Sequence, residues 1–458
     1  MPTTSQRNKC LARVCVFIMM VIMTGISFIP DSAASPENAM QNYLQRAEAD
    51  YSWTLKDTNE LKGMKIYDLR LVSQKWQGIV WSHQMRVFIP KDCKEGSALL
   101  FISGGSNKNG EPNWDKWNGE KPGLLAQMAF KTKRPVISLK QVPNQPLYGE
   151  KVEDDLISHT FLKYFETKDE TWPLLLPMTK SAVQAMTAMQ EFCAKEINLP
   201  IKGFVVAGGS KRGWTTWLTG SNDKRVIGIG PMVIDTLKMN EQMDYQLECW
   251  GKYSEQVDDY TKKGIQKKMK TPEGKDLLKI ADPYSYIKKL KIPKLIFIGT
   301  NDPYWPVDAI KHYYNDLVGE SYIHYVPNAG HDLGDGEQAV RSLTAFYDIC
   351  ASGATHPKLK WSMTRKNGAA VLTVDSGGEA KEAKLWTTAS KDRDFRDDKW
   401  TSEPCKNRDG SKFTSNIALP KEGFKSIYLE VVYPSPVEKT YSKTSRMFVL
   451  DPKGVVSE

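Results

Sequence analysis

Residues 202–220 read KGFVVAGGSKRGWTTWLTG, and this stretch decides the fold. Residues 204–207 (FVVA) are apolar and partly β-branched, which predicts a buried strand. Residues 208–213 (GGSKRG) then predict a sharp turn, and a helical pattern begins at Trp214. A serine between strand and helix is typical of a nucleophile elbow, whose tight turn lifts the hydroxyl above the edge of the sheet. The stretch departs from G-x-S-x-G, because Arg212 stands in place of the second glycine and Gly213 follows it.

An acid and a histidine follow Ser210 in the chain, each directly after an apolar run. Asp302 follows residues 293–299 (PKLIFIG), and His331 comes shortly after residues 322–326 (YIHYV). Parallel strands end at one edge of a sheet, so these loops are expected to meet there. Serine needs a base to take its proton, and the base needs a carboxylate to orient it. We therefore predict Ser210 as nucleophile, His331 as general base and acid, and Asp302 as the orienting acid.

Two segments are predicted to supply an oxyanion hole. The backbone N–H of Lys211 comes directly after the nucleophile, where acyl-transfer enzymes of this architecture place one donor. The second donor is expected from Gly105 or Ser106, in a glycine-rich turn that follows the apolar run 98–102 (ALLFI). The alternative for this turn is an ordinary glycine-rich loop.

Other residues compete for roles in the site. Asp235 ends the strand-like run after the elbow and is an alternative to Asp302 as the acid. Arg212 is a candidate to bind a substrate carboxylate or to reinforce the oxyanion hole, and the alternative is a salt-bridged surface cation. Trp250 is a candidate for lining the substrate cleft, and the alternative is packing of the surrounding segment onto the main domain.

Strand and helix patterns alternate from about residue 98 to residue 350, which predicts an α/β fold with a mostly parallel sheet between helices. Residues 237–290 interrupt the alternation and are predicted to form a cap over the site. From His356 onward, short alternating segments separated by turns predict a small β-sandwich. The expected domains are an α/β-hydrolase domain at 35–355 and a sandwich-like domain at 356–458. Residues 36–63 are expected to be helical or loose, and residues 308–318 to be helical.

Residues 1–34 are predicted to be a secretory signal. Basic residues precede an apolar run at 14–29, and Ser32, Ala33 and Ala34 offer small side chains for cleavage. The alternative is an uncleaved membrane anchor. We expect an exported protein, secreted or periplasmic, with no stable membrane span after cleavage. The five later cysteines, at positions 93, 193, 249, 350 and 405, contain no C-x-x-C pair and allow one or two disulfides.

The composition is that of an ordinary globular protein. The chain has 458 residues, of which 40% are hydrophobic and 26% charged, with a formal net charge of +9. This mild excess suits an acidic substrate or an anionic surface, and the alternative is that it serves solubility. We find no nucleic-acid motif, and the pattern implies neither a metal nor an organic cofactor. The expected partner is a small-molecule or short-polymer substrate, and the oligomeric state is left open.

The sequence resembles the PhoPQ-activated pathogenicity-related family of secreted, α/β-hydrolase-like proteins. The resemblance spans nearly the whole mature chain and rests on GGSKRGWTTW around Ser210, GTNDPYWPVD around Asp302 and PNAGHDL around His331. It implies an α/β-hydrolase core and a C-terminal β-rich domain in an exported protein, and it supplies no substrate. There is a weaker similarity to glucuronoyl esterases, in which arginine directly follows the nucleophile, whereas Lys211 does so here.

These observations favour a secreted serine hydrolase, specifically a carboxylic ester hydrolase that works through an acyl-enzyme. A serine peptidase with the same triad is one alternative. A non-catalytic binding or signalling protein on a hydrolase scaffold is another, since a fold does not settle a function.

Overall fold

The computed structural model describes residues 35–117 and 123–456. The predicted signal segment, 1–34, lies outside the described residues. None of the helices in the described part has the length and apolar character that a membrane crossing requires. Its five cysteines are all free thiols.

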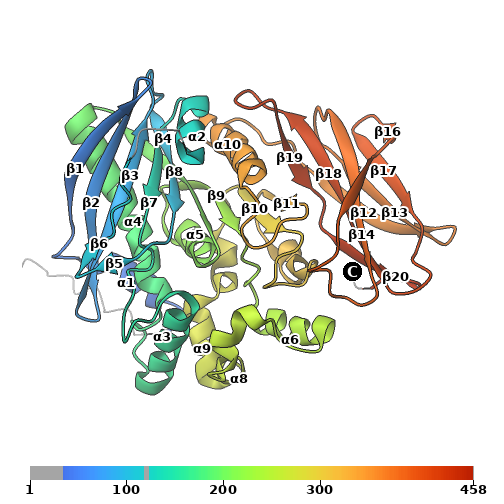
Figure 1. Ribbon diagram of the computed structural model, residues 1–458, viewed down its shortest axis with the longest axis horizontal. Coiled ribbons are helices and arrows are strands. Elements are labelled where there is room, and N and C mark those ends of the chain that lie inside the picture. Colours follow the sequence, from blue (N-terminus) through green and yellow to red (C-terminus); the bar gives the residue numbers. More distant parts are fainter. Residues whose placement is uncertain (1–34, 118–122, 457–458) are drawn as a thin grey trace, which may run out of the picture. The chain divides into compact units, whose positions relative to one another are not determined.

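A long mixed sheet runs through the protein (Figure 1). Strands β7, β4, β8, β9, β10 and β11 are parallel neighbours, and antiparallel strands extend the sheet on both sides. In spatial order its main strands are β1 (Ser52–Leu61), β2 (Met64–Trp76), β3 (Ile79–Ile89), β7 (Val136–Leu139), β4 (Gly96–Ile102), β8 (Ile201–Gly209), β9 (Val226–Met232), β10 (Lys294–Gly299), β11 (Ser321–Val326), β19 (Thr440–Thr444), β18 (Phe424–Pro434), β14 (Glu382–Ser390) and β15 (Thr401–Pro404). The parallel central part of this sheet, flanked by helices and with Ser210 directly after the central strand β8, is the α/β-hydrolase fold, so the predicted fold class is confirmed.

Helices cover both faces of the parallel part of the sheet, and each face has its own hydrophobic core. Successive side chains of a strand point to opposite faces. Leu100 and Val206 accordingly pack with α4 and α5, whereas their neighbours Leu99 and Val205 pack with α2 and α10. The four helices are α2 (Leu124–Thr132), α4 (Leu175–Phe192), α5 (Lys211–Asn222) and α10 (Glu337–Ser352).

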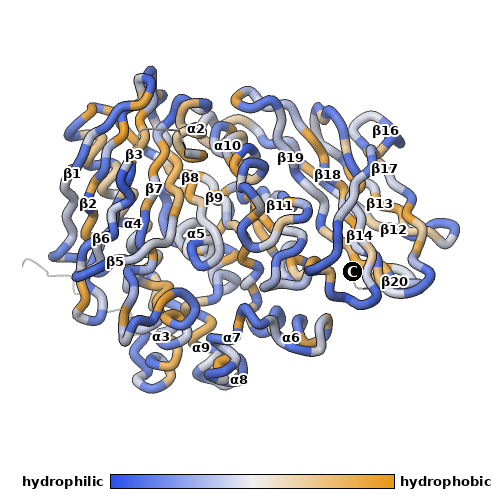
Figure 2. Tube along the Cα trace, viewed as in Figure 1, coloured by the Kyte–Doolittle hydropathy of each residue, from blue (hydrophilic) through white to orange (hydrophobic). Residues whose placement is uncertain are grey.

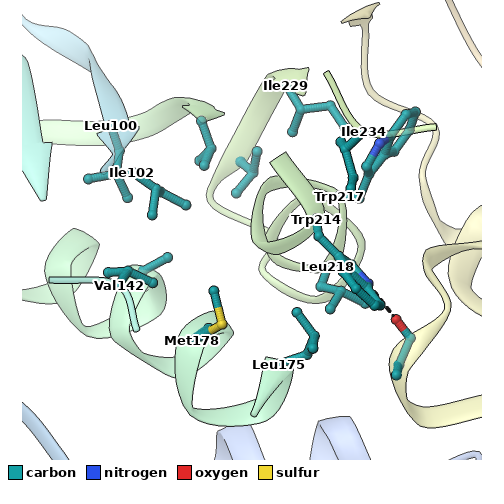
Figure 3. Close-up of a cluster of buried hydrophobic side chains, with 14 of the residues drawn as sticks. Leu100, Ile102, Val142, Leu175, Met178, Trp214, Trp217, Leu218, Ile229 and Ile234 are labelled. Carbon is teal, nitrogen blue, oxygen red and sulfur yellow. Dashed lines mark hydrogen bonds between the residues drawn. The ribbon is translucent and has the colours of Figure 1, made fainter. Parts of the chain in front are cut away.

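The central strands carry much of the hydrophobic sequence (Figure 2). Figure 3 shows the core where α5 packs against α4, with Trp214 and Leu218 near Leu175 and Met178. The Trp214 indole Nε1 also donates a 2.7 Å hydrogen bond to the Ala281 carbonyl. This bond ties α5, the helix behind the elbow, to the segment that follows β9.

That segment is a cluster of short helices inserted between β9 and β10. Its elements are α6 (Met239–Trp250), the 3₁₀ turn η2 (Glu255–Val257), α7 (Asp258–Thr261), α8 (Ile265–Lys268), α9 (Pro272–Ala281) and the 3₁₀ helix η3 (Pro283–Lys289). Helix α3 (Glu153–Thr167) contacts α7, α8 and α9. The insertion therefore agrees with the interruption seen in the sequence at residues 237–290.

The C-terminal strands form two facing antiparallel layers. One layer is part of the long sheet, because β19 pairs with β11 through Ile323 and Thr444. The other is a four-stranded sheet of β12 (Lys360–Lys366), β13 (Ala369–Asp375), β17 (Lys412–Ile417) and β16 (Asn407–Asp409). Leu372 and Phe413 from the second layer share a core with Leu385 and Leu429 from the first. The C-terminal antiparallel sheets thus agree with the predicted sandwich-like region, and the exact limits of the two domains stay a prediction.

Two local expectations were wrong. Residues 36–63 contain a short helix, α1 (Ala39–Gln45), followed by the ten-residue strand β1. Within the described part of the chain this strand pairs only with β2, and it is largely exposed, so its sequence lacks the apolar alternation that would have revealed it. Residues 308–318 form two separate 3₁₀ turns, η4 (Ala309–His312) and η5 (Tyr314–Asp316), rather than one helix.

Candidate active site

Ser210 occupies a strained turn between β8 and α5. Its backbone angles are φ 57° and ψ −126°, a region that non-glycine residues rarely adopt. The turn is held on both sides, since Ser210 N donates to Met232 O at 2.9 Å and Trp214 N donates to Ser210 O at 2.9 Å. A serine held in this strained turn has the backbone geometry of a nucleophile elbow.

Two glycines allow the strand and helix to approach closely. A β-carbon on Gly208 would lie 2.9 Å from the Arg212 carbonyl oxygen, and one on Gly213 would lie 2.7 Å from Met232 O. Gly209, directly before the serine, is different, because a β-carbon there would meet only Val233 at 3.9 Å. The displaced second glycine of the motif, Gly213, is therefore a packing requirement of this turn.

We expect Gly213→Ala to lower the free energy of unfolding by about 2 kcal/mol or more, because the added methyl group must displace backbone atoms. Gly209→Ala is the matched control and is expected to change the same quantity by less than about 1 kcal/mol. Urea unfolding of both variants checks this, and equal losses of stability would contradict it.

His331 is oriented by Asp302. The His331 Nδ1 atom lies 2.9 Å from Asp302 Oδ2, and the Tyr304 amide donates to Asp302 Oδ1 at 2.8 Å. An ionised carboxylate only accepts hydrogen bonds, so Nδ1 carries the proton and Nε2 is the basic nitrogen of the neutral ring. The Nε2 atom is buried and has no hydrogen-bond partner among the described residues. The Tyr304 ring stacks on the imidazole at a centroid distance of 4.1 Å, which restricts its rotation.

Ser210, Lys211 and His331 line one cavity. The insertion between β9 and β10 and the loop after β10 contribute most of the other side chains. The apolar and aromatic members are Trp214, Ile234, Met239, Met243, Val257, Tyr260, Ile265, Met269, Tyr304 and Trp305. Asp154, Thr236, Gln242 and Gln266 are the other polar members. The catalytic candidates thus open onto a largely apolar cavity.

Both cations of the elbow are already paired. Lys211 Nζ lies 2.7 Å from Asp154 Oδ2, and its side chain is 10% exposed. Arg212 forms two bonds to Glu153, of 2.8 and 2.6 Å, and its Nε donates to the Val142 carbonyl. Burial alone would raise the pKa of Glu153, but the Arg212 hydrogen bonds and charge hold it below the usual value. These pairs leave neither cation free to attract a substrate carboxylate.

The predicted oxyanion loop lies against the elbow arginine. A β-carbon on Gly104 would lie 2.6 Å from Arg212 Nη2, so this part of the loop packs directly on the guanidinium. Gly105 has φ +134°, and its carbonyl accepts a 3.2 Å bond from Gln145 Nε2. The Ser106 carbonyl accepts from Asn113 N at 3.0 Å. Among the described residues, those that line the cavity include neither Gly105 nor Ser106, so their role as donors stays a prediction.

Two further candidates lie apart from the cavity wall. Arg212 is not among the described lining residues. Trp250 is not among them either, and its ring packs under the Arg396 guanidinium, 4.1 Å away. Trp250 therefore packs against the loop between β14 and β15, and its predicted role in lining the substrate cleft stays a prediction.

The Asp235 carboxylate is bonded to Tyr313 and not to His331. It is 1% exposed and accepts a hydrogen bond from the Tyr313 hydroxyl. Burial raises the pKa of Asp235 to about 7. The carboxylate bonded to the imidazole is therefore that of Asp302.

No motif or spacing in the sequence points to Asp154, which connects three parts of the site. Its carboxylate accepts from Lys211 and from the Tyr260 hydroxyl at 2.8 Å, and the Tyr304 hydroxyl is 3.4 Å away. Asp154 is the second residue of α3, and its partners come from the elbow, the inserted helices and the Asp302 loop. Tyr304 could have been suspected from its place two residues after Asp302, but no spacing rule pairs Asp154 with Lys211.

Comparison with known proteins gives a family. A family model described as "PhoPQ-activated pathogenicity-related protein" matches residues 40–396. The chain belongs to this family. The resemblance to this family that the sequence motifs predicted is thereby confirmed.

Individual relatives are distant. The chain is 29% identical over 448 residues to autocrine proliferation repressor protein A of Dictyostelium discoideum, covering 90% of this chain and 89% of the relative. Among solved structures, acetyl xylan esterase 1 from Thermoanaerobacterium sp. JW/SL YS485 is similar with a TM-score of 0.49 and 17% identity, covering 68% of this chain and 93% of that chain. An acetyl xylan esterase from Paenibacillus sp. R4 has a TM-score of 0.44 and 16% identity, covering 65% and 87%. Both TM-scores are below 0.5, so we draw nothing about the substrate of our protein from these two esterases.

Proposed function

We propose that this protein is a serine hydrolase that cleaves carboxylic esters through an acyl-enzyme. The observation that carries the proposal is the His331–Asp302 hydrogen bond of 2.9 Å beside a cavity that Ser210 and His331 both line. In this mechanism the Ser210 hydroxyl attacks the ester carbonyl while His331 Nε2 takes its proton. The imidazolium then gives that proton to the departing alcohol.

The second half of the reaction repeats the first with water. His331 takes a proton from water, the resulting hydroxide attacks the acyl-enzyme, and Ser210 leaves with the proton. The negative oxygen of each tetrahedral intermediate would be held by the Lys211 amide and by an amide of Gly105 or Ser106. Asp302 keeps its charge throughout and stabilises the imidazolium.

The lining of the cavity supports a neutral, apolar group on the substrate. Three methionines, Met239, Met243 and Met269, line it, and such flexible side chains adapt to different apolar shapes. Lys211, the one lysine or arginine among the described lining residues, is bonded to Asp154. A substrate carboxylate placed there would lose its hydration without gaining a free positive partner.

We expect p-nitrophenyl butyrate to be hydrolysed with a kcat/KM at least about 10-fold above that of p-nitrophenyl hemisuccinate, since burying an unpaired charge is costly. The two acyl groups have the same number of carbon atoms and differ mainly in the terminal carboxylate. Ser210→Ala serves as the background control. Equal or faster cleavage of the hemisuccinate would contradict the apolar assignment, and faster cleavage of matched anilides than of esters would indicate a peptidase.

One comparison favours a second candidate. The Dictyostelium relative is named for repression of proliferation in an autocrine manner, which suits a secreted signalling protein on the same scaffold. Export through residues 1–34 is part of both proposals, and N-terminal sequencing of the exported protein tests it. Reaction with an active-site serine probe separates the two candidates, because a signalling protein without an activated serine would not react.

A further inference from the structure

The loop between β14 and β15, residues 391–400, reaches from the C-terminal strands to the candidate active site. It is far in sequence from Asp302 and His331, yet it bonds to both of the loops that carry them. We call residues 391–400 the clamp loop. Three sets of contacts define what it holds.

The first contact is with Asn301, the residue directly before Asp302. The Asn301 Nδ2 atom is 3.3, 3.0 and 2.8 Å from the carbonyl oxygens of residues 395, 396 and 398. Its Oδ1 atom accepts a 2.8 Å bond from the Thr300 hydroxyl. Three carbonyl oxygens require the amide NH₂ group, so the orientation of this side chain is fixed.

The second contact is with Asn328, three residues before His331. Asn328 Nδ2 donates to the Trp400 carbonyl at 3.1 Å, and the Trp400 amide donates to Asn328 Oδ1 at 2.8 Å. Trp400 is only 1% exposed and packs on Tyr428 of β18, and both belong to the hydrophobic core that also contains side chains of α4 and α5, so this end of the clamp loop is anchored in that core. Asn328 N also donates to the Thr300 hydroxyl at 2.8 Å. This bond connects the loop that carries Asp302 with the loop that carries His331, and we call these the two triad loops.

The third contact is with the inserted helices. Arg393 donates to Glu248 at 2.8 Å and to the Tyr245 hydroxyl at 2.7 Å, both on α6. Arg396 lies over Trp250 at the end of the same helix. Helix α6 also supplies Met239 and Met243 to the cavity. The clamp loop therefore touches both triad loops and one wall of the cavity.

The two triad loops pack closely against each other. A β-carbon on Gly299 would lie 2.2 Å from the Gly330 carbonyl oxygen, so the end of β10 and the His331 loop are in direct contact. Asn301 N donates to Ala329 O at 2.9 Å across the same boundary. A catalytic acid and base must be held to within a fraction of an ångström, and loops without outside support are mobile.

We propose that the clamp loop positions the acid and the base of the active site, with Asn301 and Asn328 as its positioning residues. This proposal rests on the proposed function. In it, the C-terminal strands β14 and β15 contribute to catalysis because they hold the clamp loop in place. Neither asparagine is among the described residues that line the cavity. Each acts by holding the backbone next to Asp302 or His331.

The test compares Asn301→Ala and Asn328→Ala with wild type. We expect kcat for p-nitrophenyl butyrate to fall by about 10- to 100-fold with KM changed by less than about 3-fold, because small misplacements of catalytic groups have effects of this size. Asn328→Ser is made as a milder variant in case the alanine variant does not fold. The matched control is Thr373→Val, which removes the 3.1 Å Thr373–Thr414 hydrogen bond inside the distant four-stranded sheet.

Hydrogen–deuterium exchange provides a readout that does not need turnover. We expect faster exchange at residues 299–302 and 326–331 in the asparagine variants and unchanged exchange there in Thr373→Val. An unchanged kcat in folded variants, or a loss of thermal stability without a change in kcat, would overturn the proposal. If the wild-type enzyme itself shows no turnover, the proposed function fails, and exchange decides the clamp separately: unchanged exchange in both loops would overturn it.

Discussion

Asp302→Asn is expected to lower kcat by about 10,000-fold, the loss typical of a triad whose histidine has the wrong tautomer. A carboxamide can donate a hydrogen bond to His331 Nδ1, which would move the ring proton to Nε2. The imidazole could then no longer accept the proton of the Ser210 hydroxyl. Steady-state kinetics with p-nitrophenyl butyrate measure this loss, and thermal unfolding shows whether the variant is folded.

Asp235→Asn is the matched control for that experiment. Asp235 is the competing acid in the sequence, is buried like Asp302 and follows the neighbouring strand, but it is bonded to Tyr313. Because burial raises its pKa to about 7, a substantial fraction of Asp235 is protonated at neutral pH, and asparagine resembles that form. We expect kcat to change by less than about 10-fold. A larger loss in Asp235→Asn than in Asp302→Asn would assign the orienting role to Asp235.

The parts of the fold that local sequence determines were predictable. The buried parallel strands are continuous apolar runs, and the elbow strand was found within two or three residues of its ends, since β8 spans Ile201–Gly209. The expectation that the loops of Ser210, Asp302 and His331 lie together follows from strand ends that meet at one edge of a parallel sheet. The exposed edge strand β1 was missed because such a strand needs no apolar alternation.

The surroundings of the site were not predictable in the same way. Lys211 and Arg212 could be recognised as notable cations, but their partners Asp154 and Glu153 lie more than fifty residues earlier and carry no motif. The sequence therefore left open a role in binding acidic substrates. The bonds from Asn301 and Asn328 to the clamp loop span about seventy to a hundred residues, and one sequence without its relatives contains no signal for such contacts.

The sequence also did not indicate that one sheet continues from the parallel strands into the C-terminal strands. Near residue 356 the sequence changes from alternating strand and helix patterns to short strand-like segments separated by turns, which suggests a separate β-sandwich. Pairing of β19 with β11 instead joins the C-terminal strands to the parallel sheet, close to the loop that carries His331. A strand pair of this kind depends on register between distant segments, which local pattern does not encode.

The most direct test of the central claim is labelling of the purified protein with a fluorophosphonate probe, which reacts with activated serines. We expect the wild type to be labelled and Ser210→Ala to show no labelling, since the reacting atom is gone. His331→Ala should reduce the labelling rate by at least about 1,000-fold, because the serine loses its base. Ser285→Ala, which changes a serine of the inserted helices that does not line the cavity, should label like the wild type. Folded wild-type protein that takes no label, or labelling that persists in Ser210→Ala, would contradict the account.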